Sequence, residues 1–211
     1  MSPNAVDFTR TKALKMTERE ILAKARAYAL SIVEKVDHYT YHNVGHTIEV
    51  YARASYLADV EGISEEEKTD LLIAAAFHDT GFATKYPQNE IVGADLAEEF
   101  LRSVGHPEER VSRVRRIILA TIVFTRPADI LEKIIQDADL DNLGRRDCHL
   151  RTDAYRRELQ TYSPNGFDEN GFLNFTEKLL DGGFTFHTET ARREREEGRI
   201  RNLEAFRARY R

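Results

Sequence analysis

The sequence of 211 residues has a single cysteine, Cys148, and no apolar run long enough to cross a bilayer. A lone cysteine cannot form a disulfide within the chain, which fits a reducing compartment. A membrane-spanning helix needs about 20 consecutive apolar residues, so the sequence predicts no membrane segment. Residues 1–16 also lack the apolar core of a secretory signal. We therefore expect a cytoplasmic protein with no membrane partner.

An excess of positive charge is absent as well. The 31 Lys and Arg residues are outnumbered by 36 Asp and Glu residues, giving a formal net charge of −5. Proteins that bind long nucleic acids usually present a strongly basic face. The basic stretch between Arg192 and Arg201 is interrupted by glutamates and is typical of a solvated helix face. Long nucleic acids are therefore not the expected partner.

Helical patterns dominate the first two thirds of the chain. Capping boxes, in which a Ser, Thr or Asp is followed three residues later by a glutamate, begin at Thr17, Ser64 and Asp129, each before an apolar run. Amphipathic stretches at 91–105 and 109–124 have the same helical spacing. The second of these becomes β-branched toward its end, but we expect it to be helical throughout.

The pattern weakens after Gly144, which is the expected C-cap of the helix that begins after Asp129. Residues 163–171 are rich in turn formers and predict a loop. The pair Gly182–Gly183 predicts another break, before a last charged helix that runs from about Glu189 to the end. Because no repeat or linker divides the chain, we predict one all-α domain.

A buried polar pair ends the most apolar helix. The string LLIAAAFHDTGF is apolar on every side until His78 and Asp79. A buried aspartate costs several kcal/mol unless it is paired or binds a metal. Adjacent residues point about 100° apart on a helix, so this pair converges on one ion only where the helix ends, and Thr80–Gly81 supplies that end. From these residues alone, a metal-binding pair and a structural pair are equally good interpretations.

Two further groups carry similar side chains. In YHNVGH, Asn43 is a suitable N-cap, which places His46 in the first turn of a helix and His42 just before it. In QDADLDNLG, Asp137 and Asp139 lie on opposite flanks of an apolar stripe, so periodicity does not choose between them. Taken singly, each group is more typical of surface or hydrogen-bonded residues than of metal ligands.

Together, the strings YHNVGH, AAAFHDTGF and DADLDNLG resemble the HD superfamily of metal-dependent phosphohydrolases. The resemblance covers residues 40–145, about half of the chain. It implies a single HD-domain helical bundle over residues 17–211, with a helical C-terminal part over 146–211 and an N-terminal extension over 1–16.

The resemblance also implies a ligand set. It places one divalent metal ion on His46, His78, Asp79 and Asp139. Asp139 is preferred because the alanine before it matches the family pattern, and Asp137 remains the alternative. Mixed imidazole and carboxylate ligands suit Mn, Fe, Zn, Co or Ni and accept Mg with waters.

The same resemblance suggests roles for neighbouring residues. His42 matches the histidine that is proposed to protonate the leaving oxygen in related cyclic-nucleotide phosphodiesterases. Asp79 or Glu90 is expected to orient or deprotonate the attacking water. Lys85 and Arg126 are the nearest basic candidates for phosphate contact.

Several departures from the family pattern argue for one metal ion. Binuclear relatives carry further histidines where this chain has Asn89 and Thr121. The only histidine between the HD pair and the last aspartate is His106, in the turn-like string VGHPEE. These departures also argue against the diiron oxygenase branch.

We therefore expect a phosphohydrolase that acts on a small phosphate ester, namely a nucleotide. The alternative is an HD-fold regulatory or ligand-sensing module that binds metal but has little turnover. The string FTFHTETARRE is expected either to pack against the site or to form the surface of a homodimer. Cys148 is expected to be a packing residue, and His38, His149 and His187 are expected to have no role in the site.

Overall fold

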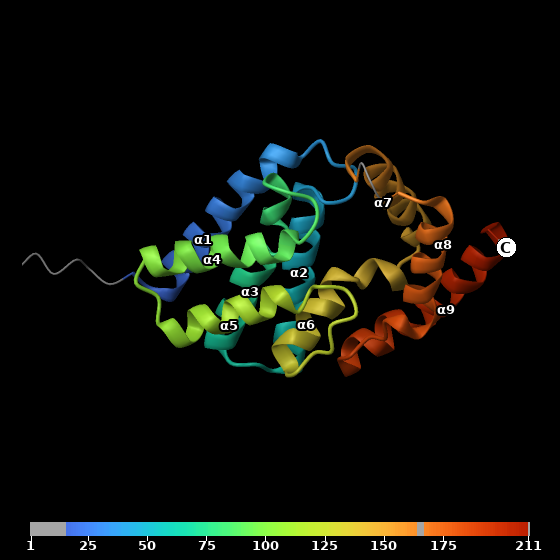
Figure 1. The fold of residues 1–211 in the computed structure, drawn as a ribbon. Helices are drawn as coiled ribbons and strands as arrows, with labels where there is room; N and C mark the ends of the chain where they lie inside the picture. The colour runs from blue at the N-terminus through green and yellow to red at the C-terminus, as the bar shows by residue number, and fades with distance from the viewer. Residues whose placement is uncertain (1–15, 164–166, 211) are drawn as a thin grey trace, which may run out of the picture.

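The computed structural model of the protein describes residues 16–163 and 167–210, and 77% of them lie in helices (Figure 1). No strand occurs among the described residues, so the all-α prediction is confirmed. Most of the expected N-terminal extension and part of the expected loop at 163–171 lie outside the described residues. The α-helices are α1 (Glu18–Val33), α2 (Val44–Glu61), α3 (Glu65–Phe77), α4 (Asn89–Ser103), α5 (Glu108–Leu119), α6 (Ile130–Asp139), α7 (Cys148–Tyr162), α8 (Glu169–Lys178) and α9 (Glu189–Tyr210).

The helix starts follow the capping signals. The boxes at Thr17 and Ser64 are both complete, with the side chain and the backbone of each cap hydrogen-bonded to the glutamate three residues on. Asp129 caps α6 through the backbone N–H of Glu132, but the Glu132 carboxylate accepts from the backbone of Ala128 instead of from the cap. All three predicted helix starts are confirmed.

Helix α3 forms the centre of the bundle. Every side chain from Leu71 to Phe77 is buried, as its apolar pattern requires, because α1, α2, α4, α5 and α6 all pack against it. The last turn of α3 therefore delivers His78 and Asp79 into the interior, where both are at least 95% buried.

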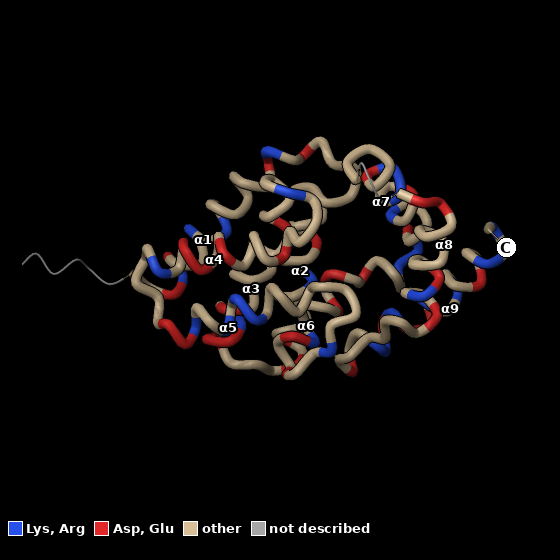
Figure 2. The backbone as a smooth tube through the Cα atoms, viewed as in Figure 1, with Lys and Arg blue, Asp and Glu red and all other residues tan. Residues whose placement is uncertain are grey.

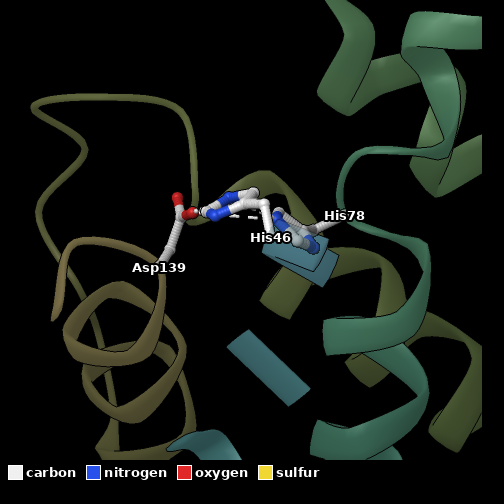
Figure 3. A group of neighbouring side chains, drawn as sticks. All are labelled: His46, His78 and Asp139. Carbon is white, nitrogen blue, oxygen red and sulfur yellow. Dashed lines mark hydrogen bonds and ion pairs between the residues drawn. The ribbon is translucent and has the colours of Figure 1, made fainter. Parts of the chain in front are cut away.

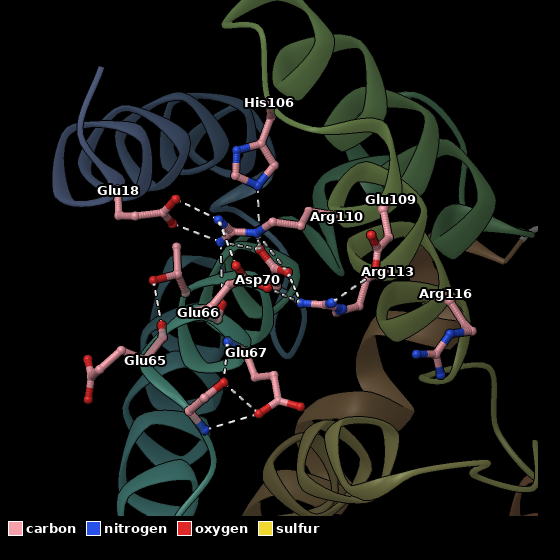
Figure 4. Close-up of polar contacts among 12 residues, drawn as sticks. Glu18, Glu65, Glu66, Glu67, Asp70, His106, Glu109, Arg110, Arg113 and Arg116 are labelled. Atoms are coloured by element: carbon pink, nitrogen blue, oxygen red, sulfur yellow. Dashed lines mark hydrogen bonds and ion pairs between the residues drawn. The ribbon is translucent and has the colours of Figure 1, made fainter. Parts of the chain in front are cut away.

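A buried ion-pair network fixes the other end of α3 (Figure 4). Asp70, which is fully buried, accepts hydrogen bonds from Arg110 at 2.7 and 2.9 Å and from Arg113 at 2.9 Å. Arg110 also donates to Glu18 on α1 at 2.5 and 2.8 Å. His106 lies beside Asp70, at 3.5 Å, and so belongs to this network. Asp70 precedes His78 by two turns of α3, roughly 12 Å along the helix, so the network ties α1, α3 and α5 together at a distance from the HD pair.

The expectation that 109–124 is one helix is wrong. Helix α5 ends at Leu119, where the Thr121 hydroxyl donates to the carbonyl of Ile118 at 2.7 Å and closes the last turn. Phe124 then adopts a left-handed backbone conformation with φ 69°, which a helix does not allow. The loop exposes three successive apolar side chains, those of Ile122, Val123 and Phe124.

The C-terminal part is more helical than its residue pattern indicates. Helix α7 was not predicted, and α8 begins at Glu169, inside the expected loop. Helix α6 ends at Asp139, and Gly144 ends the short 3-10 turn Asp141–Gly144 instead of capping α6 directly. Helix α9 starts at Glu189 as predicted, and acidic and basic residues alternate along it (Figure 2).

Helix α9 packs against the 3-10 turn after α6 through two glycines. A Cβ atom on Gly198 would lie 1.9 Å from the carbonyl oxygen of Gly144, so the two backbones are in direct contact. Helices α7, α8 and α9 lie together at one end of the molecule, beyond α6 (Figure 1). None of the helices in the described part of the chain has the length and apolar character needed to span a membrane.

Candidate metal centre

Three helix ends bring the HD motifs together. His46 lies in the first turn of α2, which Asn43 caps by accepting the backbone N–H of His46 at 3.2 Å. His78 and Asp79 follow the last residue of α3, and Asp139 is the last residue of α6. These positions let side chains that are distant in sequence point to one place.

The ligand-type atoms of these residues meet closely (Figure 3). His46 Nε2 lies 3.1 Å from Asp139 Oδ1 and 3.5 Å from His78 Nε2. One ligand atom from each of these three residues lies within 4.8 Å of the other two. Asp79 Oδ2 joins them, at 3.1 Å from His78 Nε2 and 3.4 Å from His46 Nε2. The structure thus brings together all four residues that the sequence assigned as ligands.

The surroundings of the group fit a cation. His78 Nδ1 lies 2.9 Å from the carbonyl oxygen of Ala75, to which it donates, so Nε2 is the ring nitrogen that faces the other residues. Asp79 Oδ2 is buried and has no hydrogen-bond partner among the described residues. A buried carboxylate oxygen in that position is costly unless a positive charge satisfies it. Two imidazole nitrogens and two carboxylates form a donor set that suits a divalent transition metal.

The electrostatics point the same way. Burial opposes a charge on His78, but the carboxylates of Asp79 and Asp139 outweigh it and raise the pKa of His78 to about 9. Burial likewise opposes the charge on Asp79, but nearby histidines, His78 first and then His42, lower the pKa of that carboxyl. The site therefore favours positive charge at its centre.

The alternative ligand, Asp137, points elsewhere. Its carboxylate accepts the backbone N–H groups of His187 and Thr188 and the Thr188 hydroxyl, all at 2.8 Å. Burial raises the pKa of Asp137 to about 6, against these three hydrogen bonds. Asp137 thus anchors the segment before α9, whereas Asp139 lies in the group with the histidines.

His42 lies beside the four candidate ligands, and Glu158 contacts its ring. The His42 ring stacks on Phe82, with 4.2 Å between centroids, and its Nδ1 lies 2.5 Å from Glu158 Oε1. The fully buried Glu158 carboxylate also accepts the backbone N–H of Tyr41, at 2.6 Å, and of His42, at 2.9 Å, and the Tyr86 hydroxyl at 2.9 Å. Burial opposes a charge on His42, but Asp79 and Glu158 outweigh it and raise the pKa of His42.

A cavity of about 370 Å³ opens onto these residues. Asp79, Asp139 and His42 line it, as does Glu90, whose pKa is raised by burial and then by the two aspartates. Lys85 does not line the cavity; it is exposed and donates to Gln88 at 3.2 Å. The lining also includes Tyr41, Phe82, Tyr86, Asn89, Thr121, Arg151, Tyr155 and Phe175.

Arg151 and Glu158 were missed by the sequence analysis. Both lie on α7, where the apolar spacing is too weak to predict a helix. Among the described residues that line the main cavity, Arg151 is the one with a basic side chain. It forms ion pairs with Glu49 and, at 3.3 Å, with Asp147. The other basic candidate, Arg126, lines an adjoining hollow instead.

Comparison with known proteins identifies a domain within the chain. Residues 43–141 match the family model of the HD domain. The chain carries an HD domain. HD domains bind divalent metals and generally belong to metal-dependent phosphohydrolases, and His46, His78 and Asp139 of this domain form a candidate metal-binding group.

Two crystal structures share the fold of this HD protein. YpgQ from Bacillus subtilis, solved in complex with ADP, has a TM-score of 0.64 and 22% identity, covering 92% of this chain and 97% of YpgQ. Lin1889 from Listeria innocua has a TM-score of 0.59 and 21% identity, covering 91% of this chain and 96% of Lin1889. No curated protein matches the chain. At these identities the likeness concerns the fold, and it includes α7–α9 as well as the HD core.

Proposed function

We propose that this HD protein is a divalent-metal-dependent phosphohydrolase that hydrolyses a nucleotide. One observation carries the proposal: His46, His78, Asp79 and Asp139 converge at the wall of a cavity, with Asp79 Oδ2 buried and without a hydrogen-bond partner among the described residues. These four residues would hold the ion. When bound, a divalent ion supplies Lewis acidity toward a phosphoryl oxygen and toward water.

The chain's own residues supply the proton transfers. Glu90 lines the cavity with a raised pKa, so its carboxylate is suited to accept a proton from the attacking water. His42 holds a proton against Glu158 and is suited to donate one from its other ring nitrogen to the leaving oxygen. Asn89 and Thr121 line the cavity where binuclear relatives are expected to carry histidines, which supports a single ion.

Three features support a nucleotide as the substrate. The cavity volume, about 370 Å³, lies in the range of small-ligand sites. Aromatic side chains make up much of its wall, and a nucleobase stacks well on such rings. YpgQ, whose fold covers almost the whole chain, was solved with ADP. The aromatic residues are Tyr41, Phe82, Tyr86, Tyr155 and Phe175.

The test is a turnover assay with defined metal content. Purified protein is stripped, reloaded with each divalent metal and offered phosphomonoesters, nucleotides and cyclic nucleotides. We expect turnover with at least one metal, its loss in His46→Ala and Asp79→Ala, and no change in His149→Ala, an exposed histidine outside the cavity. Metal binding without any turnover would favour a regulatory module over an enzyme. Elemental analysis near two ions per chain would contradict the single-ion proposal.

A further inference from the structure

A second hollow of about 200 Å³ adjoins the main cavity at Asp139. It lies between the loop that follows α5 and the segment that precedes α9. The two hollows share Asp139, Thr121 and Leu140 in their walls. A molecule whose reacting group lies at Asp139 therefore has room on both sides of that group.

The second hollow contains polar groups without partners. Arg126 lines it, is exposed, and forms no ion pair or hydrogen bond with any other residue that the structure describes. His187 lines it as well, and its Nε2 atom is buried without a hydrogen-bond partner among those residues. The Arg126 guanidinium and, in its Nε2–H tautomer, the His187 ring are both free to donate to an acceptor bound in the hollow.

The surroundings of His187 carry positive charge. Burial lowers the pKa of His187, and the nearby charges of Lys133 and Arg192 lower it further. The Asp137 carboxylate already accepts the backbone N–H groups of His187 and Thr188, and Asp139 is the carboxylate that lines the hollow, at its boundary with the main cavity. The hollow is therefore suited to an anion.

The main cavity is much less suited to bind an additional anion. Its basic side chain, Arg151, is paired with Glu49 and Asp147, and the carboxylates of Asp79 and Glu90 line the same wall. Charges of the same sign repel, so a second phosphate of a substrate is disfavoured there. Among the described residues that line the two hollows, the unpaired cation is Arg126, which lies across Asp139 in the second hollow.

We propose that this hollow is an anion subsite, in which Arg126 and His187 bind a phosphate group other than the one that reacts at Asp139. The inference rests on the proposed function for the position of the reacting group. The bound anion is either a distal phosphate of the substrate or released inorganic phosphate, and both are recognised by the same charge-assisted hydrogen bonds. The subsite therefore fits either a substrate that carries a second phosphate group or inorganic phosphate as a product.

Titration of the full chain with inorganic phosphate tests the subsite without any need for turnover. In ¹H–¹⁵N spectra we expect saturable shifts at Arg126 and His187, and roughly tenfold weaker binding in Arg126→Gln, as expected for the loss of one charge-assisted contact. Arg19→Gln, at an exposed arginine at the start of α1 that lines neither hollow, should bind as the wild type does. Thermal melting should be the same for all three proteins.

Kinetics then distinguish the two sources of the anion. If the subsite holds a distal phosphate, Arg126→Gln raises KM about tenfold for a nucleoside diphosphate but not for the monophosphate, with kcat little changed. If it holds released phosphate, only product inhibition by phosphate weakens. Wild-type phosphate binding by Arg126→Gln, or no saturable binding at all, would overturn the subsite even where the turnover assay succeeds. Failure of that assay alone would overturn the proposed activity and leave the titration result standing.

Discussion

Replacing Glu158 with glutamine is the sharpest perturbation that the site allows. The Glu158 carboxylate accepts from four donors, namely two backbone N–H groups, the His42 ring and the Tyr86 hydroxyl. A glutamine keeps the shape of the side chain, but its amide nitrogen donates. At least one of the four donors in Glu158→Gln then faces another donor inside the protein.

The cost follows from burial. The Glu158 side chain is fully buried and that of His42 is 15% exposed, so solvent screens this pair little. Breaking a buried charged pair and leaving a donor unsatisfied costs about 3 kcal/mol. In a chain of this length that corresponds to a melting temperature lower by roughly 6–12 °C.

The same change affects protonation. Burial raises the pKa of Glu158, but its contacts with His42 outweigh this and the pKa is lowered from 4.5; that of His42 is raised from 6.5. The lowered pKa of Glu158 stabilises the fold above about pH 4.5. This contribution is lost as the pH falls through the pKa that Glu158 has in the folded state. The raised pKa of His42 stabilises the fold below about pH 6.5. This contribution is lost as the pH rises through the pKa that His42 has in the folded state. The stability difference between wild type and Glu158→Gln is thus largest between these two values.

Differential scanning calorimetry at pH 5.5 measures the first effect, and NMR titration of the His42 ring measures the second. We expect the pKa of His42 to fall in Glu158→Gln, and the alkaline limb of the pH–rate profile to move to lower pH with it. Glu197→Gln, at an 89% exposed glutamate on α9, should change stability by less than about 0.5 kcal/mol. If Glu158→Gln melts like the wild type and His42 titrates unchanged, Glu158 does not hold the proton on His42.

Other predictions concern the metal, the ion-pair network and the cysteine. Saturation with a divalent ion at about 100 times its Kd should stabilise the fold by about 2.7 kcal/mol, so the melting temperature should fall on chelation; an unchanged value argues against a metal centre. Asp70→Asn leaves Arg110 without its buried charge partner, and we expect a loss of about 3–5 kcal/mol in urea unfolding, against almost none for Asp59→Asn at an exposed ion pair. Burial raises the pKa of Cys148 to about 11, so iodoacetamide at pH 8 should label it only after unfolding; fast labelling of the folded protein contradicts this.

The sequence predicted which residues converge at the candidate metal centre better than it predicted their support. His78 and Asp79 were identifiable because an all-apolar helix leads directly to them, and the capping residue Asn43 placed His46. The choice between Asp137 and Asp139 needed the resemblance, because both flank the same apolar stripe. The structure separates them through hydrogen bonds to the segment before α9, which no local pattern encodes.

Glu158 could not be found from the sequence for a different reason. Its partner His42 is 116 residues away, and only three side chains of α7 are buried, including Glu158 itself, so the helix shows almost no periodicity. The overlong prediction for α5 has a local cause. Helical spacing continues past Leu119, but the Thr121 hydroxyl closes the last turn and Phe124 adopts a left-handed conformation.

The contact between Gly144 and Gly198 has a mechanical consequence. With no side chains between the two backbones, neither can move toward the other without pushing it. Gly144 ends the 3-10 turn that begins two residues after Asp139, so a shift of α9 along its own axis would be transmitted to the carboxylate facing the two histidines. A partner that shifted α9 along its axis, such as a second copy of the chain, would thereby move Asp139 relative to His46 and His78.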